Sequence, residues 1–214
     1  MADDKIVKAV QQALDDAPER KFTESVDLAI NLKDVDLSIP KNRISEEIIL
    51  PKGRGREQKI AIIGSREMLL KAKDVAEITM SDAELDDFSD DKKKGRDIAN
   101  DVDFFIAEAP LMPAIGKKLG IFLGPRGKMP RPIPPGADPA PIVDNMKKSV
   151  RVRSRDKMTF HVAVGMSDMT VEDLAVNIET VLKRVTNKLD RGNQSIGSVY
   201  VKTTMGPSVR IMMR

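Results

Sequence analysis

The chain of 214 residues contains no cysteine and no tryptophan, and it has only one tyrosine and one histidine. The lack of cysteine excludes disulfides, thiol catalysis and zinc–thiolate sites. Because aromatic residues make up only 3% of the chain, a nucleic-acid interface built on aromatic stacking platforms is poorly supported.

Catalytic signatures are equally scarce. No G-x-S-x-G segment marks a serine nucleophile, and a single histidine leaves little room for a catalytic triad. That residue, His161, lies in an alternating strand pattern without a nearby carboxylate motif, so we expect a structural role for it. Carboxylate ligands for a metal cannot be assembled from the sequence, and we expect neither a metal nor a cofactor.

Long apolar runs are also missing. No run approaches the 18 residues that a membrane span needs, and the segment MADDKIVKAV at the start lacks the basic and apolar regions of a signal peptide. Apolar residues nevertheless make up 41% of the chain, which is enough for a packed core. We therefore expect a cytoplasmic, soluble protein with no membrane partner.

Charge is distributed unevenly along a chain whose net charge is only +3. Residues 74–108 carry twelve acidic and four basic side chains, a net charge of −8. Residues 109–155 carry ten basic and two acidic side chains, a net charge of +8. The asymmetry suggests a polyanionic partner on one side of the molecule, although two solvated surfaces of opposite bias would give the same pattern.

Hydrophobic periodicity divides the chain into two styles. Near both ends, alternating strands such as 22–32 accompany amphipathic helices at 3–17 and 170–189. Between them, continuous apolar strands such as KIAIIG (59–64) and VDFFIAEA (102–109) alternate with short helices, which is typical of a parallel sheet covered on both faces.

These patterns predict a mixed α/β and α+β protein of two domains. Residues 1–56 and 152–214 are expected to form a discontinuous α+β domain, and residues 57–151 an inserted Rossmann-like, three-layer α/β domain. The Gly-rich, basic segment KGRGREQ (52–58) is expected to be a hinge or linker between them.

The segment FLGPRGKMPRPIPPG (122–136) first suggests a phosphate-binding loop. The P-loop pattern fails, because Met129 follows Gly127-Lys128 and no glycine stands five positions before Gly127. No G-x-G-x-x-G segment occurs either, which argues against nucleotide hydrolysis. We expect a long, proline-stiffened loop whose three basic side chains and glycine amides meet phosphates, or else a packing loop between two strand–helix units.

The segment TTMGPS (203–208) stands between two predicted strands. Alternation makes one face of these strands polar, and hydroxyls with a carboxylate and cations suit RNA, because they can bond ribose 2′-OH groups, base edges and phosphates. Met205 could pack on a ribose or base, Gly206 would let the backbone approach a ligand, and Pro207 would fix the turn. A plain hairpin with one solvated side is the alternative. The polar members are Tyr200, Lys202, Thr204, Ser208 and Arg210, joined by Ser25 and Asp27 from the strand at 25–32.

Five segments of the chain together resemble the family of ribosomal protein one of the large subunit, in its archaeal form. They are RKFTESVDLAINLKDVD (20–36), NRISEEIILPKGRG (42–55), FLGPRGKMPRP (122–132), VGMSDMTVEDLAVNIETVL (164–182) and TTMGPSVRI (203–211). The resemblance runs over essentially the whole chain, and the combination is more specific than any one segment. It implies the two-domain fold predicted above.

The resemblance further implies a structural, non-enzymatic component of the large ribosomal subunit. Such a protein binds large-subunit rRNA at the mobile stalk beside the exit site and assists the release of deacylated tRNA. Members of the family also repress translation of their own operon by binding its mRNA. The free protein is expected to be a monomer.

The resemblance also implies which residues meet RNA. The primary set, in the terminal domain, is Lys21, Phe22, Ser25, Asp27, Lys202, Thr204, Met205, Gly206, Pro207 and Ser208. The secondary set, in the inserted domain and facing RNA or tRNA, is Arg126, Gly127, Lys128, Met129 and Arg131. Asp27 stands where bacterial members commonly carry Glu, and its shorter side chain could weaken or re-aim that contact.

One other functional class stays open, an α/β enzyme that uses the inserted domain to bind a phosphorylated small molecule. The missing phosphate fingerprints and the single histidine argue against it.

Overall fold

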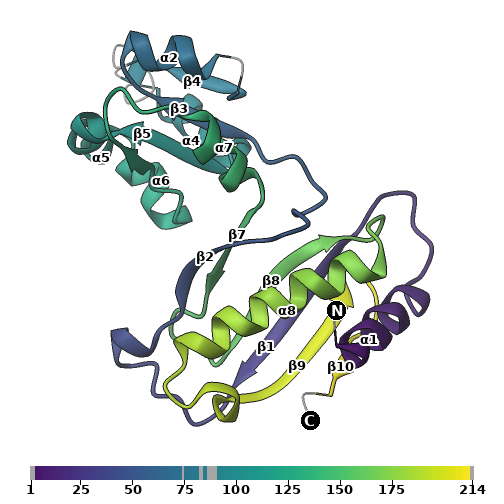
Figure 1. The fold of residues 1–214 in the computed structure, drawn as a ribbon. Helices are drawn as coiled ribbons and strands as arrows, with labels where there is room; N and C mark the ends of the chain where they lie inside the picture. Colours follow the sequence, from purple (N-terminus) through teal and green to yellow (C-terminus); the bar gives the residue numbers. More distant parts are fainter. Residues whose placement is uncertain (1–2, 74, 82–83, 86–90, 213–214) are drawn as a thin grey trace. The chain divides into compact units, whose positions relative to one another are not determined.

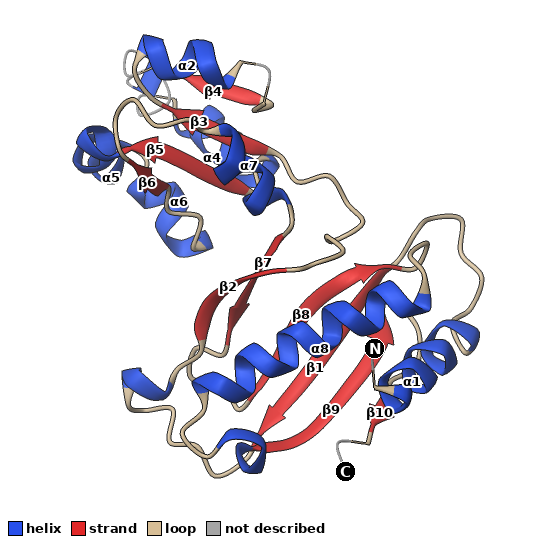
Figure 2. Ribbon diagram, viewed as in Figure 1, coloured by secondary structure: helices blue, strands red, loops and turns tan. Residues whose placement is uncertain are grey.

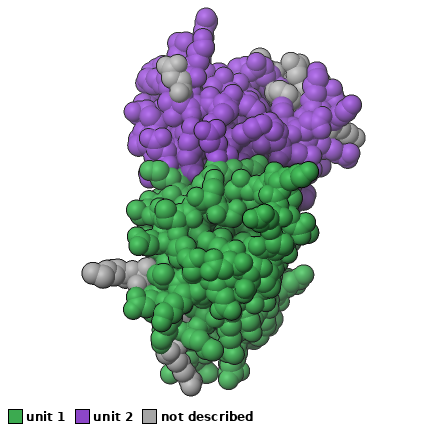
Figure 3. Space-filling model, turned by 90° about the vertical axis from the view of Figure 1, so that its right-hand side faces the viewer, with its two compact units in different colours: residues 1–56, 148–214 green, residues 57–147 purple. Residues whose placement is uncertain are grey.

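The computed structural model describes residues 3–73, 75–81, 84–85 and 91–212 of the chain. The chain divides into two compact units, each with its own sheet and core (Figures 1 and 2). Unit 1 comprises residues 1–56 and 148–214, and unit 2 comprises residues 57–147 (Figure 3). The described part contains no helix that is both long enough and apolar enough to cross a membrane.

Unit 1 is built on a four-stranded antiparallel sheet with the strand order β10-β9-β1-β8. Two helices, α1 (Asp4–Asp15) and α8 (Val171–Lys188), lie on the same face of this sheet (Figure 2). Their apolar stripes share one core with every second strand residue, and Leu28, Val162 and Val201 are fully buried there. The strands are β1 (Ser25–Leu32), β8 (Thr159–Met166), β9 (Ile196–Thr203) and β10 (Val209–Ile211).

The two predicted terminal helices are confirmed, with shorter bounds. Side-chain caps fix where they begin, because Asp3 accepts a hydrogen bond from the N–H of Lys5, and Thr170 accepts one from the N–H of Asp173. Such caps pair backbone donors that the first turn of a helix leaves without an intrahelical partner. A 3-10 turn at Gly192–Ser195 then leads from α8 into β9.

A two-stranded ribbon joins the two parts of unit 1 beside the linkers. It pairs β2 (Ser45–Ile49) with β7 (Ser149–Arg153) in antiparallel register. A 3-10 turn at Pro40–Asn42 precedes β2 in the chain. Ile48 and Val152 from this ribbon are buried in the core of unit 1. The expected boundary after residue 151 therefore falls inside β7, whose pairing with β2 assigns residues 148–151 to unit 1.

The first linker is anchored to unit 1 by Asn177, a fully buried residue of α8. Its amide nitrogen donates to the carbonyl oxygens of Gly53 and Val164 at 2.8 and 2.9 Å, and its Oδ1 accepts from the N–H of Lys52 at 3.2 Å. The ammonium of Lys52 also lies 3.0 Å from the carboxylate of Asp173. The start of the predicted hinge is thus held in place by three polar contacts, while the bond to Val164 ties Asn177 to β8.

Unit 2 is a three-layer α/β unit around a parallel sheet with the strand order β4-β3-β5-β6. Alternate residues of β3 and β5 enter different cores, so Ile62 faces α2 and α7 while Ile63 faces the side of α4, α5 and α6. The strands are β3 (Ile60–Ile63), β4 (Ile78–Met80), β5 (Phe104–Glu108) and β6 (Arg131–Ile133). The helices are α2 (Arg66–Ala72), α4 (Lys92–Asp101), α5 (Met112–Lys118), α6 (Gly120–Arg126) and α7 (Ala140–Lys147), with a 3-10 turn at Ala109–Leu111.

The predicted fold class is confirmed by these two sheets, one antiparallel and one parallel. A continuous apolar run such as β3 is buried on both faces because helices cover both faces of its sheet, whereas β9 alternates because helices cover only one.

Candidate nucleic-acid interface

The face of the unit 1 sheet opposite α1 and α8 carries the polar side chains that alternation predicted. Asp27 lies opposite Lys202 in the strand register, and Arg210 lies opposite Tyr200. These side chains are exposed or half-buried, whereas their strand neighbours belong to the core. We call this surface the open face; its polar members are Ser25, Asp27, Asn31, Thr159, His161, Ser198, Tyr200, Lys202 and Arg210.

The turn after β9 is fastened to the residues around the start of β1. Thr204 donates from its backbone N–H and from its Oγ1 to the carbonyl oxygen of Ser25, at 3.0 and 3.1 Å. The N–H of Met205 donates to Oε2 of Glu24 at 3.0 Å. Segments separated by 179 positions in the sequence therefore form one surface, which we call the corner and define as residues 20–27 and 202–208.

Three backbone donors of the corner are paired within the protein. The N–H of Gly206 donates to the carbonyl and hydroxyl oxygens of Thr203, so the amides of residues 204, 205 and 206 are all used within the protein. Phe22 and Met205 are nevertheless 60% and 56% exposed, although both are large and apolar. Exposed apolar side chains beside hydroxyls are suited to packing against the faces of bases and riboses.

Gly206 has a packing role in this turn. A Cβ atom at this position would collide with Oγ1 of Thr203 and would lie 3.5 Å from the Cβ of Ala17. The glycine thus lets the turn close against Thr203 and the residues after α1. This packing alone requires a glycine at position 206, and the expected approach of the backbone to a ligand stays a prediction.

The remaining members of the primary set differ in how firmly they are held. Lys202 donates from Nζ to the carbonyl oxygen of Thr204 at 3.0 Å, and the hydroxyl of Ser25 lies 3.4 Å from the sulfur of Met166. By contrast, the residues at the rim are exposed: Lys21, Pro207 and Ser208.

Asp27 is the half-buried carboxylate of the corner. Burial raises the pKa of its carboxyl group, and nearby His161, Lys202 and Arg54 oppose that rise only in part. The structure therefore holds a partly desolvated acceptor beside cations. Such a group costs stability by itself and can offset that cost by accepting a hydrogen bond from a ligand.

Glu24 is a corner residue that the sequence analysis missed. Its side chain is only 5% exposed, its Oε2 accepts from the N–H of Met205, and Nε of Arg20 lies 3.7 Å from its Oε1. The hydrogen bond from Met205 is the main reason why the pKa of Glu24 is lowered in the folded protein. The alternation could have predicted its burial, because Glu24 lies two and four residues before the buried Val26 and Leu28 and so falls on the same face of the strand.

The secondary set lies where the sequence analysis expected a long loop, and that expectation is wrong. Residues 122–126 belong to α6, which ends at Gly127 in the left-handed conformation with φ 69°, and residues 131–133 form β6. The N–H groups of Gly127 and of Lys128 donate to carbonyls of the last turn of α6. The glycine amide that was expected to meet a phosphate is therefore already bonded.

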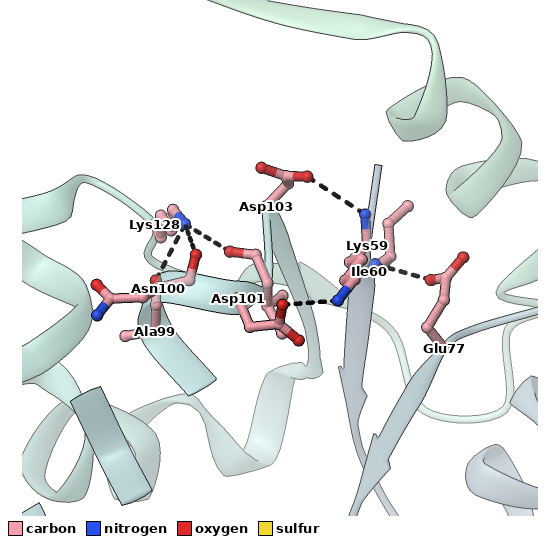
Figure 4. Close-up of polar contacts among 9 residues, drawn as sticks. Lys59, Ile60, Glu77, Ala99, Asn100, Asp101, Asp103 and Lys128 are labelled. Carbon is pink, nitrogen blue, oxygen red and sulfur yellow. Dashed lines mark hydrogen bonds and ion pairs between the residues drawn. The ribbon is translucent and has the colours of Figure 1, made fainter. Parts of the chain in front are cut away.

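The ammonium of Lys128 is bonded inside unit 2 (Figure 4). It donates to the carbonyl oxygens of Ala99 and Val102 at 3.0 and 2.6 Å and lies 3.5 Å from that of Asn100, all at the end of α4. Burial lowers the pKa of Lys128, while the nearby carboxylates of Asp103 and Asp101 oppose this. A lysine placed on the last carbonyls of a helix satisfies groups that would lack partners and complements the helix dipole.

The other members of the secondary set are less enclosed. Nε of Arg126 donates to Oδ1 of Asn100 at 2.9 Å, and the side chains of Arg126, Met129 and Arg131 are all exposed. Arg126, Met129 and Arg131 are thus the members of this set with exposed side chains.

Further polar contacts fix the strand ends next to Lys128 (Figure 4). Lys59 donates from its N–H to Oδ2 of Asp103 at 3.3 Å and from Nζ to Oδ1 of Asp101 at 2.6 Å. The N–H of Ile60 donates to Oε2 of Glu77 at 2.8 Å. These carboxylates accept hydrogen bonds from backbone and lysine donors where β3 and β5 begin, so their charge stabilises the fold of unit 2.

The carboxyl ends of β3 and β5 are where a doubly wound sheet usually binds a phosphorylated ligand. In this unit Glu108, which is 5% exposed, accepts from the N–H of Ser65 at 3.1 Å and from its hydroxyl at 2.7 Å. A protein carboxylate thus occupies the donors that a phosphate would take, which argues against the alternative of a phosphate-binding enzyme. Among the described residues, no three acidic or histidine side chains are grouped so that they could hold a metal ion.

Comparison with known proteins agrees with the resemblance noted in the sequence. Residues 8–207 match the model of the family described as Ribosomal protein L1p/L10e. Over 96% of this chain, a protein of Picrophilus torridus is 53% identical and one of Thermoplasma acidophilum is 54% identical, covering 94% and 95% of those proteins. A protein of Methanococcoides burtonii is 50% identical over 99% of this chain and its own whole length. All three are named large ribosomal subunit protein uL1. The match over nearly the entire chain confirms the expectation of a ribosomal protein rather than an enzyme, and the chain belongs to the L1p/L10e family of ribosomal proteins.

Proposed function

We propose that this chain is a component of the large ribosomal subunit that binds large-subunit rRNA directly, at the mobile stalk, through the corner of unit 1. The names of its relatives support the place in the large subunit. The observation that carries the RNA-binding role is the corner itself, where exposed Phe22 and Met205 stand beside hydroxyls and a partly desolvated carboxylate.

The chemistry of the corner fits RNA better than DNA or a protein. Its hydroxyls and the Asp27 carboxylate can pair with ribose 2′-OH groups, while Lys21 and Lys202 supply cations for phosphates. Because the amides of the turn are already bonded, sequence selection falls to side chains. The exposed Arg126, Met129 and Arg131 of unit 2 form a secondary, RNA- or tRNA-facing surface with less selectivity.

Two further roles belong to this proposal. The protein assists release of deacylated tRNA from the exit site of the cytoplasmic ribosome, and it represses translation of its own operon by binding a similar structure in the mRNA. The repression follows from the same corner, because an mRNA that imitates the stalk RNA would occupy the same side chains, whereas the tRNA would meet the secondary surface of unit 2. Ribosomes lacking the protein should release exit-site tRNA more slowly, and added free protein should inhibit translation of its own message but not of an unrelated one.

Equilibrium binding to a stalk rRNA fragment and to a scrambled RNA, across a salt series, tests the RNA-binding role. Thr204→Val with Ser208→Ala should lose about tenfold of the preference for stalk RNA, since two hydrogen-bonding groups are removed, without changing the salt slope. Met129→Ala with Arg131→Ala should mainly flatten the salt slope.

A matched control is Thr180→Val in α8. Its Oγ1 also donates to a backbone carbonyl, that of Val176 at 2.9 Å, but it lies on a helix away from the open face. The control should bind both RNAs as the wild type does. If the wild-type protein shows no preference for stalk RNA, the proposed function is wrong.

A further inference from the structure

The open face continues from the corner to the far end of β9. There β10 is too short to pair with the edge of β9. β10 pairs only with residues 199–201 of β9, so within the described chain no strand covers residues 196–198 on that side. A hollow of about 610 Å³ lies at this place. The lining residues that matter here are Lys33, Gln194, Gly197, Ser198, Arg210 and Met212.

The lining of the hollow suits an anion. Lys33 and Arg210 carry positive charge, and none of the described residues that line it is Asp or Glu. Arg210 is exposed, and its guanidinium group has no hydrogen-bond or ion-pair partner among the described residues. Lys33 has only a long contact, 4.0 Å, with the exposed carboxylate of Asp34. Both cations are therefore available to a ligand at little cost.

In the lining of the hollow, Gly197 lies against Lys33 and Asn31. A Cβ at this position would lie 3.4 Å from the Cβ of Lys33 and 3.5 Å from the carbonyl oxygen of Asn31. Beside it, the amide of Asn31 donates to Oγ of Ser198 at 2.7 Å and accepts from Oγ1 of Thr159 at 2.7 Å. Ser198 thus has its oxygen bonded within the protein, while its hydroxyl proton can be donated to a ligand.

The hollow is continuous with the corner across the open face. Arg210 lines the hollow and also lies opposite Tyr200, the only tyrosine of the chain, which is half-buried on the same face. From Ser198 to Thr204 the strand rises about 20 Å, at about 3.3 Å per residue. Several nucleotides of one RNA strand can span that length, with Lys202 and Tyr200 on the way.

We propose that this hollow, the β9-edge site, binds the phosphate backbone of the RNA strand that extends from the corner. The inference rests on the proposed function, and it adds a second contact at the opposite end of the sheet. Lys33 and Arg210 neutralise phosphates there, Ser198 and Gln194 donate hydrogen bonds to phosphate or ribose oxygens, and the contact carries no base selectivity.

The test is a salt series with stalk RNA and scrambled RNA on the double variant Lys33→Ala with Arg210→Ala. The matched control is Lys8→Ala with Arg184→Ala, which removes the same two charge types from the exposed surfaces of α1 and α8 on the other side of the sheet. The plot of log affinity against log salt should become shallower by about two for the double variant, since about one unit of slope is lost per phosphate contact. The control should leave the slope near the wild-type value.

The two RNAs separate this inference from the proposed function. The double variant should lose affinity for both RNAs by a similar factor, about tenfold, and keep its preference for stalk RNA. If wild type prefers stalk RNA but the double variant and the control have the same slope, the β9-edge site does not bind RNA. A protein strand paired to the edge of β9 would then be its occupant to look for. If the wild type binds stalk RNA no better than scrambled RNA, the proposed function itself fails.

Discussion

The buried carboxylate of Glu24 accepts a hydrogen bond from the backbone N–H of Met205 at 3.0 Å, across 181 positions of the sequence. Met205 is the residue of the turn whose side chain is both large and exposed, and this bond fixes its backbone. The exposed Met205 of the corner is therefore positioned by a buried carboxylate of the same corner.

Glu24→Gln should weaken selective binding to stalk RNA and lower the Tm, because the neutral amide accepts the Met205 N–H less strongly than the carboxylate does. Because the pKa of Glu24 is lowered in the folded protein, its contribution to stability is complete above the ordinary pKa of glutamate. That contribution is lost as the pH falls through the lowered value. The Tm difference between wild type and Glu24→Gln should therefore shrink on acidification, and a constant difference down to acidic pH would contradict this role.

Asp27→Asn should have the opposite effect on stability. Burial raises the pKa of Asp27, so ionising it at neutral pH costs the folded state some stability, and this cost disappears as the pH falls through the raised pKa. The variant should be more stable than wild type at neutral pH and equal to it in acid, while binding stalk RNA more weakly. Thermal unfolding at several pH values and RNA titration check both halves. A variant that binds RNA as well as wild type would remove Asp27 from the interface.

Gly206→Ala should destabilise unit 1 by about 1–3 kcal/mol, because its Cβ collides with the hydroxyl of Thr203. Thr203→Ala removes the colliding atom, so the double variant should be less destabilised than the sum of the two single variants. Thr203→Val keeps an atom at the collision and should give no such relief. Denaturant unfolding of all the variants measures this coupling, and strict additivity for the alanine pair would contradict the packing role of Gly206.

Lys128→Met should lower the free energy of unfolding of unit 2 by about 1–3 kcal/mol, because the carbonyls at the end of α4 lose their donor. Lys117→Met is the matched control, since Lys117 is exposed on α5. Hydrogen exchange of α4 locates the loss. If Lys128→Met unfolds as the wild type does but binds RNA less well, the ammonium serves the RNA rather than the helix.

Asn177→Asp should release the first linker from unit 1. The substituted carboxylate would face the carbonyl oxygens of Gly53 and Val164, which now accept hydrogen bonds from the amide. Trypsin should then cut faster after Arg54 and Arg56, measured by mass spectrometry of the fragments. Asn187→Asp, on the exposed side of the same helix, should be cut at the wild-type rate. Equal cleavage of both variants would show that Asn177 does not anchor the linker.

Much of the fold follows from local pattern, but pairings between distant segments do not. Alternation in β9 and the apolar run of β3 were enough to predict a half-covered and a fully covered strand. The pairing of β2 with β7, which places residues 148–151 in unit 1, joins segments about a hundred residues apart. No local sequence pattern indicates that pairing. Pairings of this kind are set by tertiary packing, which a single sequence does not display.

The same limit applies to the candidate site. The exposed faces of Ser25, Asp27 and Lys202 could be read from alternation. The contacts of Lys128 could not be predicted, because its partners, the last carbonyls of α4, lie in another element and are backbone groups that every residue has. The packing of Gly206 could not be predicted either, because the Thr203 hydroxyl folds back onto it only once the turn is formed.

The most direct measurement of the central claim is the rate of peroxide oxidation of Met205 in the wild-type protein, alone and with saturating RNA. Met205 is 56% exposed at the corner. Met158, which is 43% exposed, serves as an internal reference, because it lies two residues before the buried Phe160 and so alternates toward the helix-covered face, not the open face. We expect stalk RNA to slow the oxidation of Met205 severalfold, scrambled RNA at the same concentration to slow it much less, and Met158 to be unaffected. Oxidation of Met205 at an unchanged rate in the saturated stalk RNA complex would contradict the assignment of the corner as the RNA contact.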